Sequence, residues 1–208
     1  MVAVADHVPH QARVARRWAM SRPLPALRAI TFDLDDTLWE IGPVIRRAEA
    51  RLEQYLQRHF PAMALRLPPG EVRRRMNLLA ARRPELAHHV TALRMTVLTE
   101  AAHEAGVPAR AAELAFAEFI QARNAVTLFP DAMPVLRALG EHFALASITN
   151  GNVDVVVAGV APLFKIHVSA ELAGMAKPDP AIFHHACSAL DVAPEETLHI
   201  GDDPECDV

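Results

Sequence analysis

The chain has 208 residues, of which 51% are hydrophobic and 22% charged, and its formal net charge is −4. This composition is typical of a globular protein of one or two domains. No apolar run approaches the roughly 20 residues that span a bilayer, and the negative charge is unlike that of a nucleic-acid binder, so we expect neither a membrane-spanning nor a nucleic-acid-binding role. Two isolated cysteines, Cys187 and Cys206, have no metal or redox spacing and predict a reducing compartment, the cytoplasm.

The first 22 residues hold Arg13, Arg16 and Arg17 but lack the apolar core of a secretory signal. We expect them to form a disordered extension ahead of the folded chain. A transit-like peptide and a true start at Met20 are the alternatives.

An apolar run, residues 29–32, is followed at once by Asp33, Asp35 and Asp36 and then by Thr37. The run predicts a short buried strand of a parallel sheet. Ligands collect at the carboxyl ends of such strands, so Asp33 and Asp35 should lie in a crevice. Two carboxylates so close repel unless a cation lies between them, and Mg²⁺ binds carboxylates together with substrate phosphate. The alternative is that these acids only solvate the strand end and cap the next helix.

Residues 41–128 have helical periodicity and few glycines, which predicts an all-helical insertion. Pro43 lies in the first turn of the first helix, Pro84 is expected to begin the third, Gly106 to end it, and Pro108 to open the fourth. Apolar stripes then fall on one face of each expected helix: Val44, Ala48, Leu52 and Tyr55; Val72, Met76 and Leu79; Leu86, Val90, Leu93, Val97 and Ala101; and Phe116, Phe119 and Ile120.

Charge separates this insertion from the rest of the chain. It contains thirteen Arg and eight Glu with no Lys or Asp, a net charge of +5, whereas residues 129–208 carry −9. A cationic cap over an acidic site would steer anionic substrates and set substrate choice rather than chemistry. The alternative is that runs such as Arg73-Arg74-Arg75 are solvated helix faces.

From residue 129 the pattern alternates between helix and strand, which predicts right-handed crossovers and a parallel sheet. The predicted fold class is therefore α/β, a Rossmann-like doubly wound parallel sheet with a helical cap inserted after the first strand. The core comprises residues 23–40 and 129–208, and the cap residues 41–128. The expected strands are 143–149, 166–169 and 197–200, and the expected helices 131–142, 153–158 and 180–190.

Each later strand or loop delivers polar groups to the same sheet edge. Thr149 and Asn150 end one strand, Lys177 precedes Pro-Asp-Pro and a helix, and Gly-Asp-x-x-x-x-Asp follows the last strand with Asp202 and Asp207. Each group also has an ordinary alternative. Thr149 and Asn150 could belong to a simple turn, Lys177 could be a solvated surface lysine, and Asp203 could cap a helix.

Together and in this order, the four segments resemble the motifs of the haloacid dehalogenase superfamily, in its C1-capped subgroup, whose members are mostly Mg²⁺-dependent phosphatases. The resemblance implies that Asp33 is a nucleophile that forms an aspartyl phosphate and that Asp35 is the acid and base. It implies Mg²⁺ held by Asp33, Asp35 and Asp202, with Asp203 as an alternative ligand. It also implies phosphate contacts from Thr149, Asn150 and Lys177, and support from Thr37, Asp203 and Asp207. Haloacid dehalogenases resemble this fold but lack an acid at the position of Asp35, which disfavours dehalogenation.

The segments flanking these motifs look like the bacterial flavin-pathway phosphatases, which act on 5-amino-6-(5-phosphoribitylamino)uracil and on flavin mononucleotide. The resemblance implies a small phosphorylated metabolite as substrate and a monomer or homodimer. The family has a further helix and edge strand after its last motif, so we expect a chain truncated at Val208. A non-catalytic fragment or phosphate-binding module of the same fold, or a receiver-type signalling domain, is the alternative.

Overall fold

The computed structural model describes residues 26–207, so the expectations for residues 1–22 lie outside the described residues. Its sheet contains β1 (Ala29–Phe32), β2 (Ala144–Thr149), β3 (Ile166–Ser169) and β4 (Thr197–Ile200) in the order β3-β2-β1-β4. All three pairings are parallel, as predicted. Phe32, the last residue of β1, pairs with Ser147 and Ile200, so the segments that follow β1, β2 and β4 all leave the same edge.

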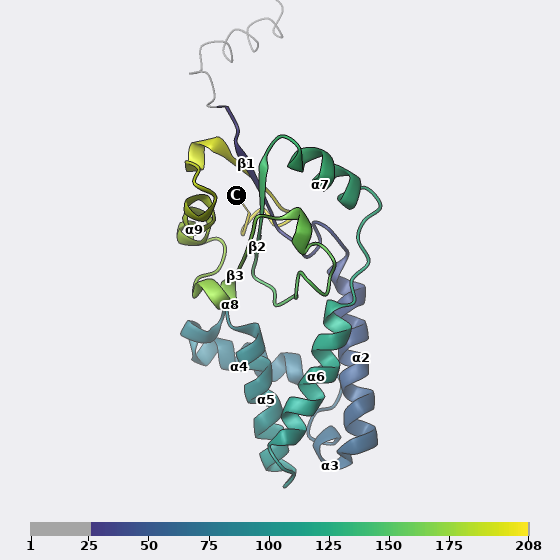
Figure 1. Ribbon diagram of the computed structural model, residues 1–208. Helices are drawn as coiled ribbons and strands as arrows, with labels where there is room; N and C mark the ends of the chain where they lie inside the picture. The colour runs from purple at the N-terminus through teal and green to yellow at the C-terminus, as the bar shows by residue number, and fades with distance from the viewer. Residues whose placement is uncertain (1–25, 208) are drawn as a thin grey trace, which may run out of the picture.

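Helices cover both faces of this sheet (Figure 1). Leu136 of α7 (Ala132–Gly140) packs with Ile30 and Leu145 on one face. On the other face, Ile182 of α9 (Pro180–Leu190) packs with Ile148 and Val168 of the sheet. Because neighbouring residues of a strand point to opposite faces, the apolar strands supply both cores, and the α/β doubly wound class is confirmed.

Short elements complete the core at its connections. They are α8 (Ala170–Ala173) and the 3₁₀ turns η2 (Ala161–Leu163) and η3 (Pro194–Glu196). The expectation of a helix over residues 153–158 is wrong, because this segment forms turns. The Asp154 carboxylate accepts hydrogen bonds from the main-chain N–H of Val156 and Val157, and Gly159 has φ of 78°. Three consecutive β-branched valines also favour helix poorly.

The insertion is helical throughout and lies beyond the carboxyl ends of the strands (Figure 1). Its elements are α2 (Ile41–His59), α3 (Pro61–Ala64), α4 (Glu71–Arg82), η1 (Pro84–Leu86), α5 (Val90–Glu104) and α6 (Arg110–Asn124). Leu52, Val97 and Phe119 belong to one buried cluster that joins these helices, as their predicted stripes require. No helix within residues 26–207 is long and apolar enough to cross a membrane.

Pro84 does not begin the third cap helix, contrary to expectation. It opens the separate turn η1, and α5 begins at Val90 because His89 leaves the helical region at φ −101° and ψ 68°. Gly106 ends α5 as predicted, since its φ of 66° suits a residue without Cβ.

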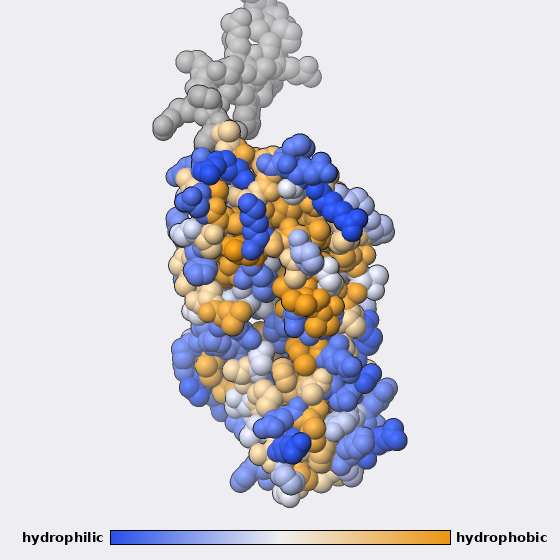
Figure 2. Space-filling model, in the orientation of Figure 1, coloured by the Kyte–Doolittle hydropathy of each residue, from blue (hydrophilic) through white to orange (hydrophobic). Residues whose placement is uncertain are grey.

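The arginine runs of the cap are mostly solvated. Arg73 and Arg74 are exposed, and Arg74 pairs with Glu71 at 2.7 Å. Hydrophilic residues cover much of the cap on the face drawn in Figure 2. Two other cap arginines, Arg94 and Arg123, are buried and line a cavity that Asp35 of the core also lines.

Candidate active site

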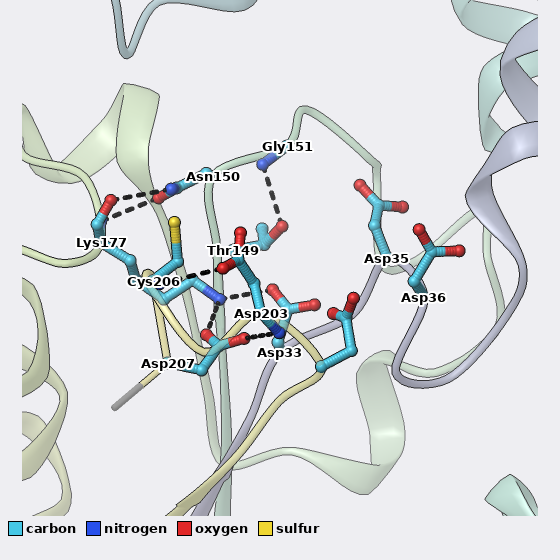
Figure 3. A pocket seen from close by; sticks show the side chains of 11 residues that line it. Asp33, Asp35, Asp36, Thr149, Asn150, Gly151, Lys177, Asp203, Cys206 and Asp207 are labelled. Atoms are coloured by element: carbon cyan, nitrogen blue, oxygen red, sulfur yellow. Dashed lines mark hydrogen bonds and ion pairs between the residues drawn. The ribbon is translucent and has the colours of Figure 1, made fainter.

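A cavity of about 200 Å³ opens where β1, β2 and β4 end (Figure 3). Eight of the nine residues that the sequence selected line it, and the ninth, Thr37, donates from its hydroxyl to Asp202 Oδ1 at 3.4 Å. The lining residues are Asp33, Asp35, Asp36, Thr149, Asn150, Gly151, Lys177, Asp202, Asp203, Cys206 and Asp207. Parallel strands that end at one edge therefore bring together groups from across the chain.

Lys177 is the cation at the centre of this cavity. Its side chain is only 2% exposed, and its Nζ lies 2.5 Å from Asp33 Oδ1 and 2.6 Å from Asp207 Oδ1. The side-chain amide of Asn150 donates to the main-chain oxygen of Lys177 and accepts from its N–H, at 3.0 and 2.9 Å. Asn150 thus fixes the lysine segment to the end of β2, a contact that the sequence did not indicate.

Burial and charge act in opposition on the two carboxylates beside Lys177. Burial raises the pKa of Asp33 to about 6, although the Lys177 ammonium opposes the shift. Burial also raises the pKa of Asp207, but hydrogen bonds from Lys177 and His199 outweigh it, so that pKa lies below its ordinary value. Asp207 is therefore a fixed anion, while Asp33 binds a proton more readily than an ordinary aspartate.

His199 and Thr31 form a second layer behind Asp207. His199 Nε2 lies 3.0 Å from Asp207 Oδ1, and Nδ1 lies 2.8 Å from the Thr31 hydroxyl. Burial lowers the pKa of His199, which favours the neutral ring. A carboxylate only accepts hydrogen bonds, so Nε2 carries the proton and Nδ1 accepts from Thr31. The sequence indicated His199 only as part of a strand.

The carboxylate of Asp35 points toward the cap. It accepts from Arg123 Nη2 at 2.9 and 2.6 Å and from Trp39 Nε1 at 2.8 Å. Burial raises the pKa of Asp35, and Arg123 opposes the shift. Arg123 lies in the last turn of α6 and its side chain is 2% exposed. A cap residue therefore contacts the predicted acid, although every motif residue lies outside the cap.

Gly151 permits this arrangement. A Cβ at this position would lie 2.6 Å from Asp35 Oδ2 and 3.1 Å from Arg123 Nη2. Its N–H also donates to Thr149 Oγ1 at 3.0 Å, which leaves the Thr149 hydroxyl hydrogen free to donate elsewhere. The glycine is thus needed for close approach.

Three carboxylates could hold a metal ion. One oxygen each from Asp33, Asp202 and Asp207 lie within 4.8 Å of one another. Both oxygens of Asp207 already accept hydrogen bonds, from Lys177, His199 and the N–H of Asp203. Asp33 Oδ1 accepts from Lys177, and Asp202 Oδ1 accepts from the Thr37 hydroxyl. An all-oxygen donor set of this kind fits Mg²⁺.

The side chain of Asp35 stands apart from this set. Its two oxygens face Arg123 and Trp39, and it does not belong to the acidic group found among residues 26–207. The role of Asp35 as a metal ligand therefore stays a prediction, since its side chain lies outside the acidic group described among residues 26–207.

The fold is a doubly wound parallel sheet with a helical cap, and aspartate, lysine and threonine side chains line a cavity at the carboxyl edge of the sheet. This combination defines a hydrolase of the capped class that uses an aspartate. The chain belongs to the haloacid dehalogenase-like hydrolase family, whose model matches residues 27–208.

Two curated relatives of the chain are phosphatases. The chain is 31% identical over 191 residues to 5-amino-6-(5-phospho-D-ribitylamino)uracil phosphatase YigB of Escherichia coli, covering 90% of this chain and 80% of that protein. It is 42% identical over 122 residues to phosphoserine phosphatase of Thermus thermophilus, covering 55% and 49%. The enzyme is accordingly a phosphatase.

A solved structure described as a 2-haloacid dehalogenase of Pseudomonas syringae pv. tomato DC3000 superposes with a TM-score of 0.82 at 36% identity. The match covers 88% of this chain and 80% of that one. It supports the same fold, including the cap inserted after β1.

Proposed function

We propose that the enzyme hydrolyses a small phosphate monoester with Mg²⁺ through an aspartyl phosphate on Asp33, and that the substrate is a flavin-pathway phosphate of the kind named for YigB. The observation that carries the mechanism is the position of Lys177, whose ammonium lies 2.5 Å from Asp33 Oδ1 and so orients the Asp33 carboxylate in the cavity. The likeness to YigB supports the substrate.

The first step uses this geometry. Asp33 Oδ2 attacks phosphorus in line, the new O–P bond forms, and the ester P–O bond breaks. The raised pKa of Asp35 favours the protonated acid, which gives its proton to the departing oxygen. Lys177 and the Thr149 hydroxyl stabilise charge on the phosphoryl oxygens. Mg²⁺ bound by Asp33 and Asp202 would neutralise further charge there.

The second step reverses the role of Asp35. Its carboxylate takes a proton from a water molecule, which attacks the aspartyl phosphate, releases inorganic phosphate and restores Asp33. A cavity of about 200 Å³ has room for a phosphoryl group and its attacking water.

The proposal is tested by phosphate release from a panel of esters with Mg²⁺ and after chelation. We expect Mg²⁺-dependent turnover, with the highest kcat/KM for 5-amino-6-(5-phospho-D-ribitylamino)uracil among a set that includes flavin mononucleotide and phosphoserine. Metal-independent turnover would contradict the Mg²⁺ proposal, and preference for phosphoserine would contradict the flavin-pathway proposal. Halide release from 2-haloacids would assign dehalogenation instead.

Mg²⁺ affinity should depend on pH, because protons compete for Asp33. Its pKa is raised to about 6 without metal, so the carboxyl is protonated below that pH and Mg²⁺ must displace the proton. The apparent Kd should be constant above about pH 7 and rise about tenfold per pH unit below about pH 6. Calorimetry at about pH 5, 6 and 7.5 measures this dependence. Equal affinity at all three values would exclude Asp33 as the titrating ligand.

Gly151→Ala should lower kcat about 100-fold, the order of loss that a displacement of about 1 Å at a catalytic group produces. The added Cβ would push the Asp35 carboxylate away from Gly151. The control is Gly140→Ala, where the nearest atom is Leu145 Cδ1 at 3.6 Å, an ordinary contact. Steady-state kinetics and thermal unfolding of both variants separate a local displacement from a folding defect. Full activity of Gly151→Ala would mean that Asp35 needs no such placement.

A further inference from the structure

A second cavity of about 170 Å³ lies between the cap and the core and shares Asp35 and Gly151 with the first. Its walls include the apolar side chains of Ile45, Met76 and Phe119, all from cap helices. Any group bonded to the ester oxygen that Asp35 protonates can extend from the first cavity into the second, because Asp35 lines both.

Two buried guanidinium groups line this second cavity and are incompletely hydrogen-bonded. Arg94 Nη1 and Arg123 Nη1 are inaccessible to solvent and have no partner among residues 26–207. The two side chains are 9% and 2% exposed. A buried charged donor without an acceptor is costly, and native structures leave few of them. These two donors therefore point to acceptors supplied by a ligand.

The rest of each guanidinium is fixed in place. Arg94 Nη2 donates to Glu49 Oε1 at 3.0 Å, and its guanidinium carbon lies 3.7 Å from the centre of the Phe119 ring. Arg123 Nη2 donates to both oxygens of Asp35. In each group the buried Nη1 is held in place by the contacts of the rest of the guanidinium, so little reorganisation is needed when a ligand binds.

Each of the two guanidinium groups is paired with one carboxylate, Arg94 with Glu49 and Arg123 with Asp35. A carboxylate or a carbonyl oxygen of the substrate would accept a charge-assisted hydrogen bond from either Nη1.

We propose that this second cavity binds the leaving group of the substrate and that the Nη1 atoms of Arg94 and Arg123 recognise acceptor oxygens on it. This rests on the proposed function, since it requires the phosphoryl group in the first cavity. The substrate class is a phosphate monoester whose leaving group combines an apolar or planar body, packed on Ile45, Met76 and Phe119, with carbonyl or carboxylate oxygens.

The test uses three esters that differ at one position: 4-methylphenyl, 4-acetylphenyl and 4-carboxyphenyl phosphate. For each ester, kcat/KM of Arg94→Met is divided by that of the wild type, which cancels the intrinsic reactivity of the ester. We expect this ratio to be at least about tenfold lower for the acetyl and carboxyl esters than for the methyl ester, as loss of a charge-assisted hydrogen bond predicts. Arg110→Gln, at an exposed arginine of α6, is the control and should give equal ratios.

The outcomes are distinguishable. A selective loss on the carboxyl ester alone assigns a carboxylate, and a loss on both acceptor esters assigns a carbonyl oxygen. Equal ratios for all three esters would overturn the proposal and leave the Nη1 atoms to bound water. If the wild type with Mg²⁺ hydrolysed none of the esters, the proposed function would fail.

Binding can be measured without turnover. Calorimetry of 4-carboxyphenyl phosphate with Asp33→Asn should give a Kd at least about tenfold tighter than with the Asp33→Asn, Arg94→Met double variant. Equal Kd values would count against the second cavity even if catalysis proceeds as proposed. Should Arg94→Met not fold, Arg94→Lys keeps the charge and removes the planar donor, and the same comparison applies.

Discussion

Asp33→Asn should lower kcat by about 10⁴ to 10⁶-fold, as removal of a nucleophile does in other enzymes that use covalent catalysis. The amide is nearly the same size as the carboxylate but has no anionic oxygen to attack phosphorus. Asp33 also lies 2.5 Å from Lys177, so the variant weakens the ion pair that orients the cavity. Initial rates with Mg²⁺ on any accepted ester measure the loss.

The matched control for this variant is Asp36→Asn. Asp36 lines the same cavity, and its Oδ1 accepts from the N–H of Ile41, which an asparagine oxygen can still do. Its φ of 60° also suits asparagine. We expect its kcat within a few-fold of wild type. Comparable losses in the two variants would show that charge in the cavity, rather than the nucleophile, had been removed.

The residues at the strand ends were predictable because local pattern and topology agree there. A buried parallel strand reads as an apolar run, and its carboxyl end must open at the ligand edge of the sheet. Asp33 follows β1, Thr149 ends β2, and Asp202 lies two residues after β4; the structure places all three around one cavity. Lys177 follows no strand. Its position at this site was predicted from the resemblance to the family's motifs.

Arg123 could not be predicted in this way. It contacts Asp35, 88 positions away in the sequence, and the contact depends on how α6 packs against α2 in the cap. Nothing in its neighbourhood distinguishes it from the twelve other cap arginines, most of which sequence alone assigns to solvated faces. Burial is the property that separates it from them, and burial of one side chain is set by tertiary packing.

Residues 153–158 are the opposite case, because the local sequence itself favours a turn over the expected helix. The alternation of helices and strands suggested a helix here, but Asp154 followed by three valines favours a side-chain-capped turn. In this structure the turn is also tied to the cap, because the N–H of Asp154 donates to Asn124 Oδ1 at 2.9 Å.

Asp35→Asn should affect the two chemical steps unequally. Without an acid, an ester with a poor leaving group should lose about 10² to 10⁴-fold in kcat, the usual contribution of proton transfer. An ester with a good leaving group, such as 4-nitrophenyl phosphate, needs no proton and should still phosphorylate Asp33. Because the same residue later activates water, the aspartyl phosphate should then accumulate.

Intact-protein mass spectrometry after acid quench measures the trapped phosphoryl group, and rates on 4-nitrophenyl and ethyl phosphate measure the leaving-group dependence. Arg123 and Trp39 can both still donate to the asparagine oxygen, so the position of the side chain should persist. Asp179→Asn is the control, since Asp179 caps α9 through its Oδ1 and an asparagine caps equally well. Equal losses on both esters with no trapped intermediate would remove Asp35 from acid and base catalysis, and its contact with Arg123 would then be structural.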